Sequence, residues 1–239
     1  MPITLDPLLL GPVGHSDRPL AGLTVLVVED SRFASEAVRL LCLRSGARIR
    51  RADSLSAARR HLGVYMPSVV IIDQGLPDGS GIELIRDLAH AKARVPVILA
   101  TSGDDRNLIA AMDAGADGFL PKPIESLAVF QKAVLENLPN YQQPKGPRLV
   151  SNEMISPDQI AFRDDLAHVA DLLTTSDHGE TIDYVAKFLT GVARSAHDHA
   201  LEAAASDLAK SHMTGAAIGS DLARVAGLLQ ERLEGQVVI

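Results

Sequence analysis

Residues 69–81 of the chain are VVIIDQGLPDGSG. The first four, Val69–Ile72, form a fully apolar, β-branched run that is typical of a strand buried on both faces of a parallel sheet. Asp73 follows directly, and Gly75–Gly81 holds three glycines and one proline, which predicts a loop. A carboxylate is therefore expected where a buried strand ends, at the edge of a sheet.

Short apolar runs alternate with helical patterns on both sides of this stretch. The expected strands cover residues 23–28, 47–52, 69–72, 95–100 and 118–120, and the expected helices cover 31–45, 54–62, 82–92, 106–113 and 124–138. Strands that alternate with helices of this length predict an α/β fold with a doubly wound, five-stranded parallel sheet.

The rest of the chain has a different pattern. We expect an N-terminal extension over 1–21, the α/β domain over 22–138, a linker with four prolines over 139–157, and an all-α domain over 158–239. Four apolar stripes at helical spacing in the last segment predict an antiparallel helical bundle. Because no proline interrupts 158–239, the second and third stripes are also compatible with one long helix, in a hairpin that must form a homodimer to bury its apolar seam.

The net charge of −7 is distributed unevenly. Residues 1–150 contain 17 Lys and Arg against 16 Asp and Glu, whereas residues 151–239 contain 6 against 14. A DNA-binding module needs a basic face, and base stacking needs aromatic rings, but the chain has no Trp and only 3% aromatic residues. We therefore expect a protein partner for the helical segment and no nucleic acid.

Two further features concern the compartment. No apolar run approaches the roughly 18 residues that a membrane span needs, and Asp6 stands where a secretory signal would be basic. A single cysteine, Cys42, excludes an internal disulfide. These features predict a cytoplasmic protein without a membrane partner.

Polar residues follow the predicted strands where their carboxyl ends meet: Glu29, Asp30, Asp73, Thr101 and Lys122. Clustered carboxylates repel one another and need a cation, and an all-oxygen set with room for water favours Mg²⁺. The cation, the lysine and the threonine hydroxyl are the groups that stabilise a phosphoryl group in transfer, with Asp73 as the nucleophile.

The chain resembles the receiver domains of two-component response regulators over about residues 22–138. The resemblance rests on LTVLVVEDS (Leu23–Ser31), VVIIDQGLPDGSG (Val69–Gly81), PVILATSG (Pro96–Gly103) and AGADGFLPKPI (Ala114–Ile124). It implies that Asp73 is the phosphoacceptor, that Asp30 binds Mg²⁺ directly and Glu29 through water, and that the backbone carbonyl of Gly75 is a further ligand.

The same resemblance implies a switch. Thr101 matches the switch hydroxyl, Lys122 the phosphate-binding lysine and Phe119 the switch aromatic residue, and the bond before Pro123 is expected to be cis. The implied function is a response regulator that takes its phosphoryl group from a histidine kinase or a histidine phosphotransfer protein. It would catalyse only its own phosphorylation and dephosphorylation, and would signal through the helical domain.

One departure from the family concerns two glycines. Gly75 and Gly103, each two residues past an expected site residue, lack side chains that in relatives often shade the phosphoryl group. Two alternatives stay open: the bare site admits water freely, or it lacks the groups that orient water, and the lifetime of the phosphoryl group depends on which of them holds.

The helical domain allows a second hypothesis, a histidine phosphotransfer module. Its motif is H-x-L-K-G, and the segment His199-Ala-Leu-Glu-Ala is loosely similar, with Glu202 in place of lysine. His212, in SHMTGAAIG, is a second candidate. A bundle used only for contacts is the competing interpretation.

Overall fold

The computed structural model describes residues 18–104, 106–139, 151–175 and 180–235. Five parallel strands form one sheet in the order β2-β1-β3-β6-β7. Their bounds are Thr24–Val28 for β1, Arg48–Ala52 for β2, Val69–Asp73 for β3, Val97–Ser102 for β6 and Gly118–Pro121 for β7. The predicted doubly wound parallel sheet is confirmed.

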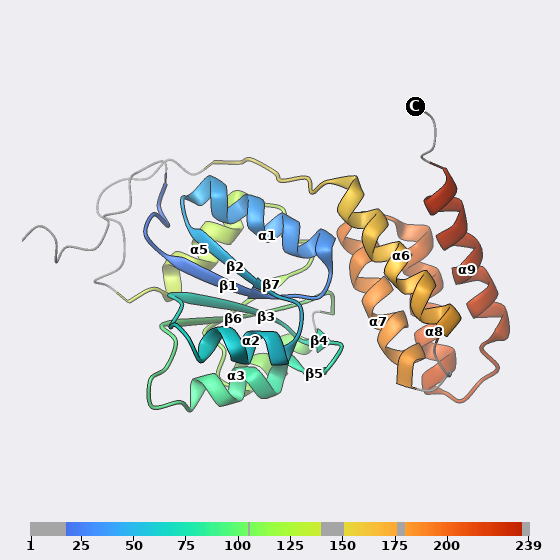
Figure 1. The fold of residues 1–239 in the computed structure, drawn as a ribbon, viewed down its shortest axis with the longest axis horizontal. Helices are drawn as coiled ribbons and strands as arrows, with labels where there is room; N and C mark the ends of the chain where they lie inside the picture. The colour runs from blue at the N-terminus through green and yellow to red at the C-terminus, as the bar shows by residue number, and fades with distance from the viewer. Residues whose placement is uncertain (1–17, 105, 140–150, 176–179, 236–239) are drawn as a thin grey trace, which may run out of the picture.

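Helices cover both faces of this sheet (Figure 1). Side chains of α1 (Arg32–Ser45) and α5 (Leu127–Asn137) pack on one face with the alternate residues of β1 and β3. The other face is covered by α2 (Leu55–Leu62), α3 (Gly81–Ala89) and α4 (Asn107–Asp113). Because β1, β3 and β6 are buried on both sides, their sequences are continuous apolar runs.

A small hairpin that the sequence did not predict interrupts the loop after Asp73. Its strands are β4 (Gly75–Leu76) and β5 (Gly79–Ser80), joined by Pro77 and Asp78. The Asp78 carboxylate accepts hydrogen bonds from the backbone N–H groups of Leu55 and Ser56, at 2.7 and 2.9 Å. The hairpin is thereby attached to the first turn of α2, which holds the loop beside the sheet edge.

Segments outside the predicted α/β domain also contribute to it. Leu20, placed by the sequence in an extension, is fully buried, and its N–H donates to the Ser45 carbonyl. After α5, residues 151–155 return along the domain: Ile155 is buried in the same core and its N–H donates to the Glu125 carbonyl. This part of the predicted linker therefore packs against the α/β domain, while residues 1–17 and 140–150 lie outside the described part.

Four helices follow: α6 (Gln159–Thr175), α7 (Glu180–Ser195), α8 (His199–Met213) and α9 (Gly219–Glu234). They share one apolar core formed by the stripes that the sequence predicts. The alternative of one long helix through the second and third stripes is wrong. His197, at φ 57°, lies between the end of α7 and the start of α8, where the helical conformation is interrupted. Asp198 then caps α8, because its side chain accepts a hydrogen bond from the Leu201 N–H.

The helical domain stands at the edge of the sheet toward which the strand arrows point in Figure 1. The α6 and α7 helices both contact α1, and α7 also contacts β4. The Phe33 ring, from α1, packs edge-to-face on Phe162 of α6 with ring centroids 5.6 Å apart, inside the core of the helical domain. Within the described ranges, no helix is both long enough and apolar enough to cross a membrane.

Candidate functional site

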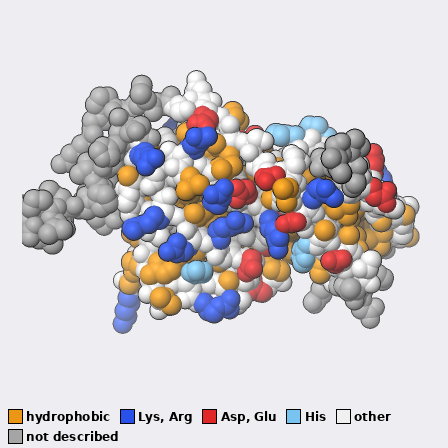
Figure 2. Space-filling view, turned by 45° about the horizontal axis from the view of Figure 1, so that its top comes forward, with side chains coloured by type: hydrophobic (Ala, Val, Ile, Leu, Met, Phe, Trp, Pro, Cys, Tyr) orange, Lys and Arg blue, Asp and Glu red, His pale blue; other side chains and the backbone are white. Residues whose placement is uncertain are grey.

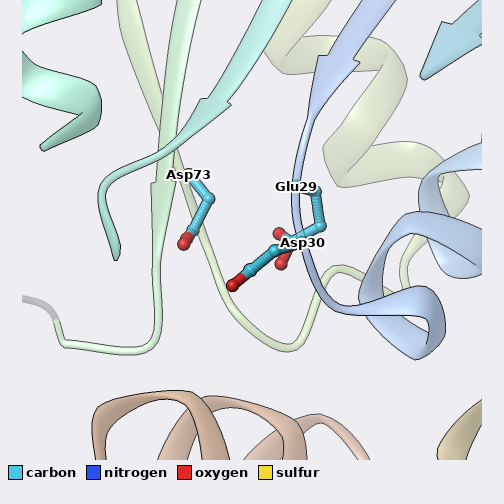
Figure 3. Close-up of side chains that lie close together, drawn as sticks. All are labelled: Glu29, Asp30 and Asp73. Atoms are coloured by element: carbon cyan, nitrogen blue, oxygen red, sulfur yellow. The ribbon is translucent and has the colours of Figure 1, made fainter. Parts of the chain in front are cut away.

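Three carboxylates converge at the carboxyl edge of the sheet. Glu29 and Asp30 follow β1, and Asp73 ends β3, the neighbouring strand (Figure 3). One oxygen from each of the three lies within 4.8 Å of the others. The strand-end positions that the sequence singles out are therefore brought together.

The Lys122 side chain joins two of these acids. Its Nζ lies 2.7 Å from Glu29 Oε2 and 2.9 Å from Asp73 Oδ1, and all three side chains are at most 10% exposed. Lys122 follows β7, whose pairing with β6 brings it to the same edge, and its peptide bond to Pro123 is cis, as the resemblance predicts. A fixed cation therefore lies against the expected phosphoacceptor.

Burial changes the acid–base properties of the site. It raises the pKa of Glu29 to about 8, with repulsion from Asp73 and Asp30 adding to the effect and Lys122 opposing it. It likewise raises the pKa of Asp30 to about 7, together with the negative charge of Asp73. Burial alone would lower the pKa of Lys122, but the charges of Asp73 and Glu29 raise it well above its ordinary value. If all three carboxylates were ionised, they would carry more negative charge than the one lysine neutralises, which is why the pKa values of Glu29 and Asp30 are raised.

Thr101 lies beside Asp73 in the register of β3 and β6. Its side chain is 1% exposed, and its hydroxyl has no hydrogen-bond partner within the described residues. Phe119, by contrast, is partly exposed and lines a surface groove with residues of α4. The structure thus places an unpaired hydroxyl next to the predicted phosphoacceptor, and the predicted switch ring at the surface.

The loop after Asp73 is closely fitted to it. The Gly75 N–H donates to Asp73 Oδ2 at 3.0 Å; the predicted role of the Gly75 carbonyl as a ligand stays a prediction. A Cβ on Gly81 would lie 2.0 Å from the Asp73 carbonyl oxygen, so only glycine fits where the chain turns into α3.

The helical domain reaches this site directly. Tyr184 of α7 donates its hydroxyl hydrogen to Asp30 Oδ2 at 2.7 Å. Gly103 does not face open water: a Cβ there would lie 3.5 Å from Gly191 Cα of α7. Ser195, at the end of α7, lines a small pocket together with Lys122 and Pro123. The α7 helix therefore crosses the edge of the sheet from Asp30 to Lys122.

Asp165, a buried acid of α6, binds the N-terminus of α1. Asp165 is 2% exposed and accepts three hydrogen bonds, from Ser31 Oγ at 2.7 Å and from the N–H groups of Arg32 and Phe33 at 2.8 and 3.0 Å. These donors belong to the N-terminus of α1, where a negative charge is favourable. Burial nevertheless raises the pKa of Asp165, because these bonds compensate only part of the cost of desolvation.

Sequence reasoning missed Tyr184 and Asp165. A signal for Asp165 exists, because it lies on the apolar stripe between Phe162 and Val169, where an acid needs a partner. For Tyr184 we find no comparable signal in the sequence.

The predicted phosphohistidines lie elsewhere. The His199 side chain is 85% exposed at the start of α8, with Nδ1 at 3.7 Å from Glu202, and His212 lies in the last turn of α8. His168 instead lines the acidic cavity beside Asp30 and Tyr184.

The donor set fits a hard divalent cation. Three carboxylates supply oxygen ligands only, the pKa values of two of them are raised, and a cavity of about 1030 Å³ leaves room for water ligands beside Glu29 and Asp30. Mg²⁺ at this position would be held by Glu29, Asp30 and Asp73.

Comparison with known proteins agrees with this geometry. Residues 25–134 match the family model described as the response regulator receiver domain. The KDP operon transcriptional regulatory protein KdpE of Escherichia coli K12 is 38% identical over 99 residues, which cover 41% of this chain and 44% of that protein. The virulence transcriptional regulatory protein PhoP of Salmonella typhimurium is 29% identical over 114 residues, covering 46% and 51%. This chain spans about half the length of the curated relatives it matches.

Two solved structures are similar to part of this chain. A response regulator structure from Chloroflexus aurantiacus has 29% identity and a TM-score of 0.43, covering 48% of this chain and 98% of that one. The receiver domain of the sensor histidine kinase PA1611 from Pseudomonas aeruginosa, solved with a coordinated magnesium ion, has 22% identity and a TM-score of 0.44, covering 48% and 97%. From the family match and the site, residues 25–134 of this chain are a response regulator receiver domain of a two-component system.

Proposed function

We propose that the receiver domain accepts a phosphoryl group on Asp73 from a phosphorylated histidine of a kinase or phosphotransfer protein, and passes the signal to the helical domain. The observation that carries this proposal is the contact of Lys122 Nζ with Asp73 Oδ1 at 2.9 Å, beside the unpaired hydroxyl of Thr101. A buried carboxylate with an adjacent ammonium and an available donor suits a group that arrives with several negative oxygens.

The transfer itself needs few groups. An Asp73 oxygen attacks phosphorus, the phosphorus–nitrogen bond of the phosphohistidine breaks, and its electron pair returns to the imidazole. Lys122 keeps its charge throughout and shifts from the carboxylate to the phosphoryl oxygens, while Thr101 donates the hydrogen bond that it lacks in this structure. Mg²⁺, when bound, would neutralise charge on the transferring group. Beyond this reaction on itself, the chain is proposed to have no enzymatic activity.

The proposed output is a protein contact. Figure 2 shows that most Lys and Arg side chains on that face lie over the receiver domain rather than over the helical domain. Residues 151–239, with 6 Lys and Arg against 14 Asp and Glu, have an unfavourable charge for a phosphate backbone. KdpE and PhoP, by contrast, are named as transcriptional regulators. A gel-shift assay tests this alternative, and DNA binding by this chain would contradict the proposed output.

Incubation with acetyl phosphate and Mg²⁺, followed by phosphate-affinity electrophoresis, tests the acceptor. We expect one phosphorylated species that is stable to acid, labile to base and lost in Asp73→Asn. Asp87→Asn, an exposed aspartate paired with Arg59, is the matched control and should be phosphorylated normally. Phosphorylation that persists in Asp73→Asn would refute the proposal.

A further inference from the structure

The receiver and helical domains meet at the phosphoacceptor site itself. Contacts from α7 run along the whole carboxyl edge of the sheet: Tyr184 at Asp30, Gly191 at Gly103, and Ser195 beside Lys122. Asp73 is only 7% exposed beneath this edge. A protein donor must bring a phosphohistidine to Asp73, and α7 occupies the surface on which that donor would have to rest.

Two groups of polar contacts define this arrangement. Asp165 binds three donors at the N-terminus of α1, directly after the metal-binding acids. His197, just after α7, has its Nε2 2.8 Å from Glu125 Oε1, close behind Lys122 in the chain. The helical domain is thus held on both sides of the phosphoacceptor site.

The Tyr184 hydroxyl is the group of the helical domain that hydrogen-bonds to a carboxylate of the proposed cation site. It lies 2.7 Å from Asp30 Oδ2, so it occupies space where an ion bound to this carboxylate would keep its water ligands. Its hydrogen bond also directs partial positive charge at the carboxylate, as a cation does. A hydroxyl and a hydrated Mg²⁺ would therefore compete for the Asp30 carboxylate.

We propose that the helical domain is a cap on the phosphoacceptor site, held by α6 and α7, and that undocking of α7 is coupled to Mg²⁺ binding at Asp30. This inference rests on the proposed function and adds its regulation. Coupling of this kind is reciprocal: if the docked cap weakens Mg²⁺ binding by a given factor, bound Mg²⁺ weakens docking by the same factor. The acidic cavity between the domains admits the ion, whereas a protein donor has to wait for the cap to open.

The first measurement is Mg²⁺ affinity by calorimetry, using the full chain and the metal alone. Tyr184→Phe removes the hydroxyl and keeps the ring that packs on Phe188, at 5.7 Å between centroids. Removing one hydrogen bond to a charged group should strengthen Mg²⁺ binding about tenfold to 150-fold. Tyr65→Phe is the matched control, since this tyrosine faces His61 after α2, and its affinity should equal that of the natural sequence.

The second measurement is the distance between the domains. Cysteines at Val64 and Met213, which are 86% and 81% exposed, carry spin labels, while the native Cys42 is fully buried and its raised pKa keeps it unreactive. We expect Mg²⁺ with beryllofluoride to lengthen the distance, and Tyr184→Phe to shift the distribution the same way at lower Mg²⁺.

Neither measurement requires phosphoryl transfer, so failure of the cap and failure of the proposed function can be distinguished. An Mg²⁺ affinity of Tyr184→Phe within twofold of the Tyr65→Phe control, or a distance that Mg²⁺ and beryllofluoride leave unchanged, would overturn the cap, even if Asp73 is phosphorylated. Loss of all labelling by acetyl phosphate in the natural chain and in Tyr184→Phe would instead overturn the acceptor role of Asp73.

Discussion

Removing the unpaired hydroxyl of Thr101 should have opposite effects on the stability of the unphosphorylated and of the phosphoryl-bound protein. It is buried next to Asp73 and has no partner within the described residues. A buried polar group left without a hydrogen bond costs about 1–3 kcal/mol, and an apolar group of the same shape avoids that cost. Thr101→Val should therefore raise the free energy of unfolding of the unphosphorylated protein by about 1 kcal/mol, and its melting temperature by about 2–4 °C.

The phosphoryl-bound state should respond in the other direction. There, the hydroxyl is expected to bond to a charged oxygen, an interaction worth about 1.5–3 kcal/mol. The added stability that Mg²⁺ and beryllofluoride confer should be smaller by this amount in Thr101→Val. Thermal melts and urea titrations, each with and without beryllofluoride, measure both effects on the same samples.

Ser35 of α1 provides the control, because its hydroxyl is also buried without a partner in the described part of the chain. Ser35→Ala should be neutral or stabilising and should keep the full response to beryllofluoride. The reasoning is refuted if Thr101→Val lowers the stability of the unphosphorylated protein by more than about 1 kcal/mol, or leaves the beryllofluoride response intact.

Three further predictions concern the site and its supports. The pKa of Glu29, about 8, and that of Asp30, about 7, lie above their ordinary values of 4.5 and 3.8. The stability that these groups contribute is therefore complete below those ordinary values and is lost as pH rises to about 8. Since Mg²⁺ binds the ionised carboxylates, it should raise the melting temperature more near pH 8 than near pH 5. A larger effect near pH 5 would contradict this. Lys122→Met leaves two buried carboxylates without their cation and should cost about 3–5 kcal/mol in metal-free urea titrations, partly restored by Mg²⁺; no restoration would count against a metal site. Asp78→Ala removes the cap that it gives α2 and should cost about 0.5–2 kcal/mol, with Asp87→Ala as a control near zero.

The sequence predicted the receiver site because its signals are local. Each site residue follows an apolar run, and in a parallel sheet the ends of such runs meet at one edge. Thr101 and Lys122 could be assigned in this way although they lie far from Glu29 along the chain. The hairpin of β4 and β5 was missed because strands of two residues leave no periodicity to detect.

Contacts between the domains could not be predicted in the same way. The four apolar stripes predicted the helices, but a stripe does not say which surface its helix covers. That Asp165 would cap α1 and that Tyr184 would reach Asp30 depends on the placement of one domain on the other. The four-helix interpretation implied a break between the second and third stripes but did not place it at His197, although Asp198 before an apolar stripe is a recognisable N-cap.

The Phe33 ring belongs by sequence to the receiver and by packing to the interior of the helical domain. A boundary drawn through the linker therefore divides a single hydrophobic core between two fragments. If a gene fusion moved α6 to α9 onto another receiver, the new host would need a comparable ring at the start of its first helix. Without such a ring, the transferred helices would leave an opening in their core where Phe33 now packs on Phe162.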